Sequence, residues 1–136
     1  MRIAPHVLTV LVSRAEDLPG IWVSHCLNLD VISQGETIPE AIEAIKEAVL
    51  MVLNEDESEG LDPFGRERAP EECWHLLSRV MREGVPVDSI KDQETIEAMV
   101  TQLRVFRVAR TELEQVPPPW QVAALRGTSD LRCSRS

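Results

Sequence analysis

Apolar and polar positions alternate over short stretches in the first third of the chain. Residues 6–14 are rich in Val and Leu, and the segment 15–20 that follows is rich in turn-forming residues. Residues 21–27 alternate with a period of two, and residues 31–34 form a third short stretch closed by Gly35. Because the connections are too short for parallel crossovers, these three strands are predicted to form an antiparallel meander.

The period of the apolar positions changes after Thr37. Thr37 and Glu40 form the T-x-x-E pattern of a capping box, with Pro39 in the first turn, where its missing N–H costs nothing. Apolar residues then recur at helical spacing, at positions 38, 41, 42, 45, 48, 49 and 52. A helix is therefore predicted from Thr37 to about Asn54, followed by an acidic loop over residues 55–65.

A second helix is predicted over residues 71–83. Pro70 opens it and Gly84 stops it. Its expected apolar face consists of Trp74, Leu77, Val80 and Met81.

The segment after Gly84 gives weaker signals. Residues 85–90 are expected to be extended or looped, and a third helix is expected from Gln93. That helix rests on the helical spacing of Ile96, Met99, Val100 and Leu103. Residues 104–110 fit either its continuation or a strand, so residues 85–90 and 104–110 are the two candidates for a fourth strand.

Together these elements predict an α+β fold, in which a three- to four-stranded antiparallel sheet is packed by one main helix and followed by a helical C-terminal extension. Residues 1–60 are expected to form the sheet-plus-helix domain. Residues 61–116 are a mixed helical extension that either stands beside the sheet or completes it. Residues 117–136 are expected to be a flexible tail, since they begin with three prolines.

Charge is distributed unevenly along the chain. The net charge is -9, and residues 1–60 hold 3 Lys+Arg against 11 Asp+Glu, whereas residues 61–136 are nearly neutral. Such a balance argues against a protein that coats nucleic acid. The three scattered cysteines are typical of a reduced cytosolic protein. The apolar runs are too short to span a membrane, so a cytoplasmic location is expected.

The first 40% of the chain contains, in order, a Gly20-Ile21-Trp22 strand start, a turn from Ser33 to Thr37, and the helix pattern Glu40-Ala41-Ile42 followed by Ile45-Lys46-Glu47-Ala48. This combination is similar to the pattern of the HicB family of antitoxins. The residues that define the fold motif are Gly20, Gly35, Thr37, Glu40, Ala41 and Ala48. Gly35 is expected to provide a positive φ or a close approach of helix and strand. The small Ala41 and Ala48 are expected to let the helix lie close to the sheet.

This resemblance implies a partial ribonuclease-H-like fold without nuclease activity or cofactor. Members of the family bind HicA, a small toxin that cleaves messenger RNA, and cover the region of its catalytic histidine. They commonly assemble as homodimers or tetramers, and many carry a C-terminal DNA-binding motif. The acidic first half would complement a basic ribonuclease, although acidic domains are also common merely for solubility.

The candidate partner-binding residues lie on the second and third strands and in the turns after them: Trp22, His25, Asn28, Gln34 and Glu36. Two of them have an alternative interpretation. Trp22 either packs beneath the helix or marks an exposed contact patch. His25 shares the face of Ile21 and Val23, which also fits a partly buried, hydrogen-bonded histidine.

Catalysis and metal binding are not expected. The acidic residues lie in turns and on the solvated helix face, whereas two-metal nuclease chemistry needs carboxylates that converge from strands. His25 and Cys26 are adjacent on a strand and point to opposite faces, and Cys73 and His75 diverge on a helix. Cys26 and Cys73 are expected to be small buried groups. A cysteine nucleophile lacks an accompanying oxyanion-hole or triad pattern.

Nucleic-acid contacts have one candidate, the pair Arg104 and Arg107, which would share a face if the third helix continued. A solvated or salt-bridged face is the alternative. Neither a helix-turn-helix nor a ribbon-helix-helix is evident, so operator DNA binding is not expected. The sequence thus predicts an antitoxin that masks a HicA-like toxin, with an orphan HicB-like oligomeric adaptor without toxin or DNA binding as the alternative.

Overall fold

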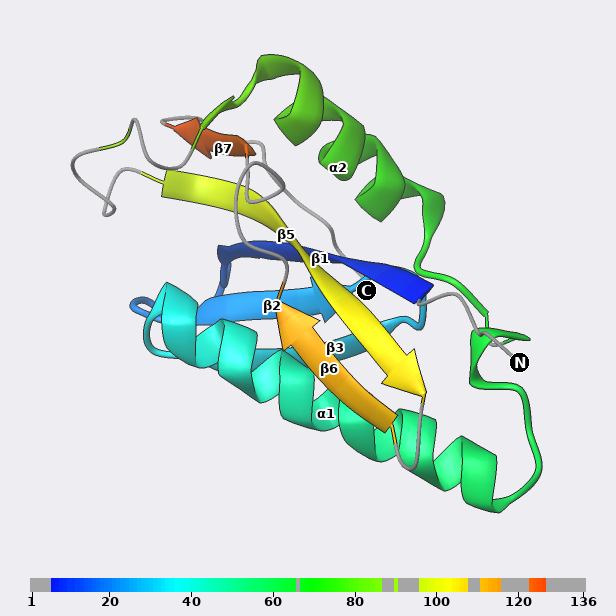
Figure 1. Cartoon of the computed structure of the whole chain (residues 1–136). Helices are drawn as coiled ribbons and strands as arrows, with labels where there is room; N and C mark the ends of the chain where they lie inside the picture. Colours follow the sequence, from blue (N-terminus) through cyan, green and yellow to red (C-terminus); the bar gives the residue numbers. More distant parts are fainter. Residues whose placement is uncertain are drawn as a thin grey trace.

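An antiparallel sheet forms the centre of the molecule. The computed structural model describes residues 6–65, 67–86, 90, 96–107, 111–115 and 123–126. Four strands lie side by side in the order β3-β2-β1-β5 (Figure 1). They are β1 (His6–Arg14), β2 (Trp22–Cys26), β3 (Val31–Gly35) and β5 (Ile96–Arg107). The predicted α+β fold, with a four-stranded antiparallel sheet and one main helix, is confirmed.

Three shorter strands continue the sheet beyond β5. The strand β7 (Ala123–Arg126) pairs with the first half of β5, and β6 (Thr111–Gln115) pairs with its second half. The two-residue strand β4 (Val85–Pro86) pairs with β7. Of the predicted flexible tail, residues 117–136, only β7 lies within the described residues. The segment 104–110, one of the two candidates for the fourth strand, overlaps the end of β5.

The meander of β1, β2 and β3 agrees with the pattern of the sequence. Val10 pairs with Cys26 of β2, and Cys26 pairs in turn with Val31 of β3. Gly20 has a φ of 81° in the turn before β2, a left-handed conformation that glycine adopts without strain. Gly20 therefore has the turn-forming role that the motif predicts.

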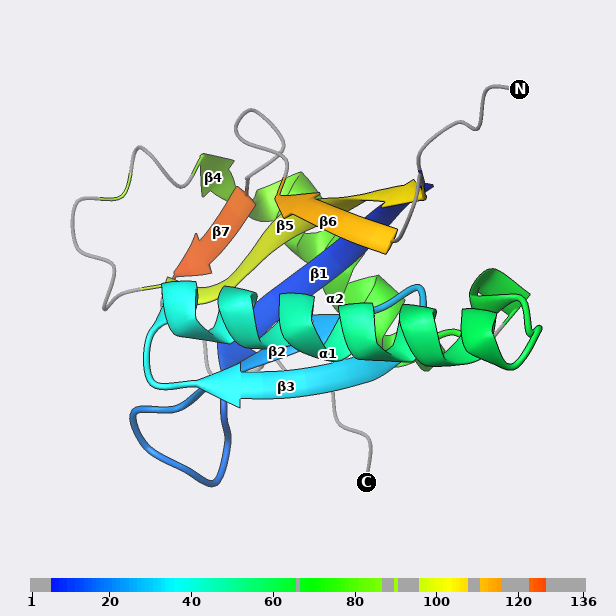
Figure 2. The same cartoon turned by 60° about the horizontal axis from the view of Figure 1, so that its bottom comes forward.

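The helix α1 (Ile38–Ser58) lies along one face of the sheet (Figure 2). Its buried stripe packs on the even-numbered residues of β1 and on Trp22 and Cys26 of β2. The largest fully buried side chains in this core layer include Leu8, Ile45, Leu53 and Leu103. This layer packs the HicB-like segment, which contains β1, β2, β3 and α1, against β5, which lies far away in the sequence.

The helix α1 is longer than predicted, because it continues past Asn54 to Ser58. Leu53 and Asp56 are buried, so the inward-facing stripe extends by one turn into the supposed acidic loop. The helix ends at Ser58, and Gly60 follows its C-cap with a φ of 76°. Leu61 N–H donates to Asp56 O at 2.8 Å and Gly60 N–H to Glu57 O at 3.1 Å, which together form a Schellman motif. A short 3-10 turn, η1 (Pro63–Gly65), follows.

A second helix, α2 (Glu71–Glu83), covers the opposite face of the sheet, beside β5 and β7 (Figure 1). Its bounds agree with the prediction, but its buried face does not. Cys73, Leu76 and Val80 are buried against Leu11 and Val100, with Trp74 and Leu77 at the margin. Met81, expected on the buried face, is 55% exposed. The inward face is therefore rotated toward Cys73.

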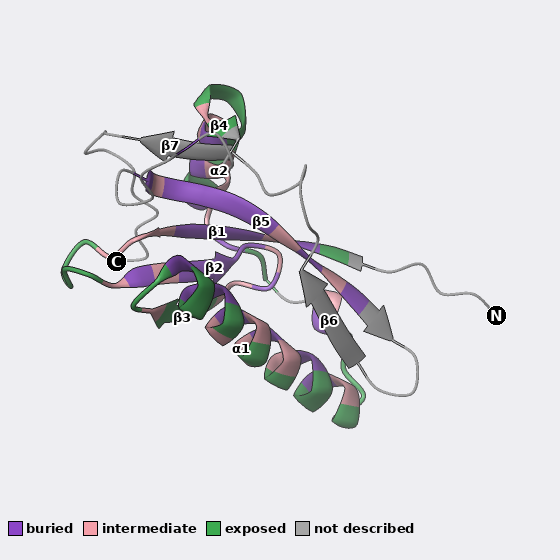
Figure 3. Cartoon of the chain, turned by 60° about the vertical axis from the view of Figure 1, so that its left-hand side comes forward, coloured by how far each residue is buried: buried purple, intermediate pink, exposed green. Residues whose placement is uncertain are grey.

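The expectation of a third helix is wrong over residues 96–107, which form β5. Residues 93–95 lie outside the described residues. The strand β5 pairs with β1 along most of its length, for example Leu103 with Leu8 and Val100 with Leu11. Since α1 and α2 cover the two faces, apolar side chains are buried on both sides of β5. Figure 3 shows most of the described part of this strand as buried. A strand buried on both faces lacks simple alternation, and here its apolar spacing imitates that of a helix.

Candidate protein-binding surface

Two of the five predicted partner-binding residues are buried. Trp22 is 7% exposed and packs in the core beneath α1, so the packing alternative is the observed one. His25 is 4% exposed. Its Nε2 lies 2.7 Å from the Asp30 carboxylate, in agreement with a buried, hydrogen-bonded histidine. Neither side chain forms an exposed patch, which corrects the expectation for His25, whereas the Trp22 ring also lines a hollow at the surface.

The turn between β2 and β3 explains how His25 finds its partner. Asp30 has a φ of 54°, a left-handed conformation that is uncommon for a residue other than glycine. This turn brings the Asp30 carboxylate back to His25, five residues earlier. Asn28 has a structural role as well, because its Oδ1 accepts the Thr9 N–H at 2.7 Å where β1 and β2 diverge. The sequence contains no periodic signal for either contact.

Gln34 and Glu36 are the two predicted residues that lie on the surface. Gln34 belongs to β3, which has no neighbour on its outer edge among the described strands. Glu36 lies between β3 and α1 and begins a stripe of exposed carboxylates. The stripe comprises Glu36, Glu40, Glu43 and Glu47, and we call it the acidic stripe. Spacings of three and four residues place Glu40, Glu43 and Glu47 along one side of α1, and Glu36 precedes the N-cap.

The start of α1 uses its own side chains to satisfy its free N–H groups. Thr37 Oγ1 accepts the Glu40 N–H at 3.1 Å, as the capping-box pattern predicts. The Glu40 carboxylate accepts the N–H of Glu36 at 2.9 Å, one residue earlier than in the usual capping box. The cap therefore holds Glu36 and Glu40 at the beginning of the acidic stripe.

Gly35 and Ala41 allow close packing at this junction. A Cβ built on Gly35 would lie 2.5 Å from the Ala41 nitrogen and 2.7 Å from the Glu40 carbonyl carbon. The close approach predicted for Gly35 is thus observed, whereas a positive φ is not. Ala41 is fully buried, and Ala48 is half-buried two turns further along α1.

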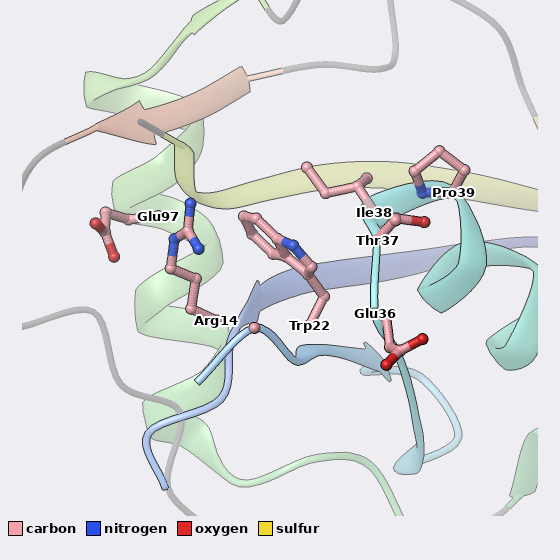
Figure 4. Close-up of a pocket in the computed structure, with 8 residues that line it drawn as sticks. Arg14, Trp22, Glu36, Thr37, Ile38, Pro39 and Glu97 are labelled. Carbon is pink, nitrogen blue, oxygen red and sulfur yellow. The ribbon is translucent and has the colours of Figure 1, made fainter. Parts of the chain in front are cut away.

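A hollow of about 580 Å³ opens beside this junction, at the ends of β1, β2 and β3 (Figure 4). The Arg14 guanidinium carbon lies 4.4 Å from the centroid of the Trp22 ring, a cation–π geometry. Arg14 Nε also donates to the Ile96 carbonyl oxygen at 3.0 Å. Glu36 and Glu97 are the acidic residues of its lining. Sequence reasoning missed this site, since its residues come from four separate segments.

The two described cysteines have different environments. Burial raises the pKa of the Cys26 thiol to about 11, although the backbone N–H groups of Leu29 and Asn28 oppose this. Cys26 is a free thiol, whereas Cys73 is disulfide-bonded. The prediction that the cysteines are reduced therefore holds for Cys26 and is wrong for Cys73. Within the described ranges, no three His, Cys, Asp or Glu residues lie close enough to hold a metal ion.

The arginine pair proposed for nucleic-acid contact does not share a helix face. Both residues belong to the strand β5 and not to a helix. Arg104 lies opposite Glu114 of β6 in register, and Arg107 lies opposite Thr111. Among the described residues, α2 is followed by β4 and then β5, and no second helix succeeds it.

Comparisons with known proteins give no further assignment. No family model matches the chain, and neither a curated protein nor a solved structure matches it. In the part of the chain that the structure describes, none of the helices has the length and apolar character needed to cross a membrane.

Proposed function

We propose that this chain is an antitoxin-type protein that binds and masks a small basic toxin of the HicA kind, which cleaves messenger RNA. The proposal is carried by the acidic stripe, Glu36, Glu40, Glu43 and Glu47, on the segment that resembles HicB. All four carboxylates are exposed, and the half-buried Lys46 is paired with Glu43 at 3.2 Å. A ribonuclease that grips RNA needs a basic surface, which such a stripe complements.

The local architecture supports a binding role rather than a catalytic one. The capping of α1 and its close packing at Gly35 hold Glu36 and Glu40 in place at the start of the helix. A rigid surface loses little conformational entropy when it binds, so the cost of ordering it does not weaken the affinity. The protein would act stoichiometrically, by covering the toxin.

Co-expression with a small basic protein encoded by a neighbouring gene tests the proposal. We expect the chain to restore growth that the neighbouring product suppresses, and the two proteins to co-purify as a complex. Failure of both results would overturn the antitoxin proposal. A stable homo-oligomer that does not bind the protein encoded by the neighbouring gene would instead favour the orphan adaptor. Light scattering on the purified chain measures the oligomeric state.

A further inference from the structure

We propose that the hollow beside Trp22 receives a cationic side chain, arginine or lysine, from a basic protein partner. The hollow lies where β1, β2 and β3 meet the first turn of α1 (Figure 4). Register brings its parts together, since Trp22 pairs with Arg14 on one side and with Gly35 on the other. Its volume of about 580 Å³ is large enough for a long side chain.

The walls of the hollow suit a long aliphatic stem. The Trp22 ring lies at its base, and Ile38 and Pro39 line the side formed by α1. Ile38 is only 9% exposed and belongs to the core beneath α1, so this wall is fixed in place. Lysine and arginine bury their methylene stems along such apolar surfaces while the charged head stays near water.

The charge of the lining favours a cation over an anion. Among the described lining residues, Glu36 and Glu97 are acidic and Arg14 is the one cation. Arg14 is held by its stacking on Trp22 and by its bond to the Ile96 carbonyl, and Figure 4 shows it between Glu97 and the Trp22 ring. Glu97 is half-buried and Glu36 is exposed, and Figure 4 places them on opposite sides of the Trp22 ring.

The helix start beside the hollow also disfavours an anion. The backbone N–H of Glu40 already donates to the Thr37 hydroxyl, and the N–H of Glu36 donates to the Glu40 carboxylate. These donors would otherwise attract a phosphate or carboxylate to the helix N-terminus. The carboxylates beyond them on the acidic stripe would steer a basic partner toward the hollow.

A peptide titration of the full chain tests this inference. Nuclear magnetic resonance would follow the Trp22 indole and the amides of Gly20 and Thr37 as acetyl-Gly-Arg-Gly-amide is added. We expect saturable shifts at these positions. The same peptide with neutral citrulline in place of arginine should bind several-fold more weakly, and the glutamate peptide should cause no saturable shift.

Two matched double variants locate the interaction. Removing both lining charges with Glu36→Gln and Glu97→Gln should weaken arginine-peptide binding about tenfold. Glu67→Gln and Glu72→Gln remove the same charge from exposed positions outside the hollow and should leave binding unchanged. Preferred binding of the glutamate peptide, equal binding of the arginine and citrulline peptides, or no saturable shift would each overturn the inference.

The inference rests on the proposed function in one respect, namely that the partner is a basic protein. Because the titration uses peptides, its outcome is independent of any toxin. A hollow that binds the arginine peptide in a chain that co-purifies with no toxin would preserve this inference and contradict the antitoxin proposal. A chain that forms a toxin complex but does not bind the arginine peptide would support the antitoxin proposal and contradict this inference.

Discussion

Gly35 shows how strongly one residue limits the junction between β3 and α1. An added Cβ would meet backbone atoms of Glu40 and Ala41 at 2.5–2.7 Å, and backbone cannot move aside as a flexible side chain can. We expect Gly35→Ala to lower the free energy of unfolding by about 2 kcal/mol or more. Urea denaturation measures this change.

Gly65→Ala is the matched control for this substitution. Its added Cβ would meet only the Asp62 side chain, at 3.9 Å, without a positive φ. Its stability should stay within about 0.5 kcal/mol of the parent. Equal losses in the two variants would contradict the close approach at Gly35.

The Cys26 thiol makes the free energy of unfolding depend on pH in the alkaline range. The folded state raises the pKa of this thiol from 9.0 to about 11, so the folded chain retains a proton that the unfolded chain releases. The stabilisation is therefore complete below pH 9 and is lost as the pH rises toward 11. We expect a loss of roughly 2 kcal/mol across that window.

The variant Cys26→Ala should flatten this alkaline profile. The chain contains no Tyr, and its lysines are Lys46 and Lys91, so few other side chains titrate in the same range. Free energies of unfolding at pH 8, 9, 10 and 11 make the comparison. A profile in the variant as steep as that of the parent would show that Cys26 is not the responsible group.

Individual contacts were predictable only where they are local in the chain. The capping pair Thr37 and Glu40 could be identified because its pattern spans a single helical turn. The alternatives for Trp22 could not be decided in advance, since its burial depends on where α1 lies over β2. Asp30 was not identified as the partner of His25, because the contact depends on a left-handed turn at an aspartate.

At the scale of the element, α1 depends on its first turn. The Thr37 hydroxyl satisfies an N–H that has no partner within the helix. We expect Thr37→Ala to cost about 1 kcal/mol of stability, measured by thermal or urea unfolding. Ser58→Ala is the control at the other end of α1, where the hydroxyl donates to the Glu55 carbonyl. A loss at Ser58 equal to that at Thr37 would argue against a specific N-terminal cap.

The elements that the sequence predicted well are those with strong local signals. β1 is rich in Val and Leu, β2 alternates, α1 has a helical period, and α2 lies between Pro70 and Gly84. The strand β5 was missed because both of its faces are buried. The extra turn of α1 was missed because its residues are mostly acidic, including the buried Asp56. In both cases tertiary packing overrides the local pattern.

At the scale of the molecule, the two faces of the sheet differ in what they present. The helix α1 covers one face and carries the acidic stripe, while α2 covers the other with a smaller core. From the net charge of -9 we could predict that the partner-binding surface is acidic, but not where it lies. The stripe is placed by the helix, and the hollow beside Trp22 by segments that only the fold brings together.

Inhibition of a HicA-like toxin in a purified system is the most direct test of the central claim. Cleavage of a messenger RNA by that toxin is measured while the chain is added in increasing amounts, at low and high salt. We expect stoichiometric inhibition by the parent and by the control variant Glu67→Lys with Glu72→Lys. We expect association at least about tenfold slower at low salt for Glu43→Lys with Glu47→Lys. Undiminished cleavage at every ratio, or equal and salt-independent behaviour of the three proteins, would contradict the account.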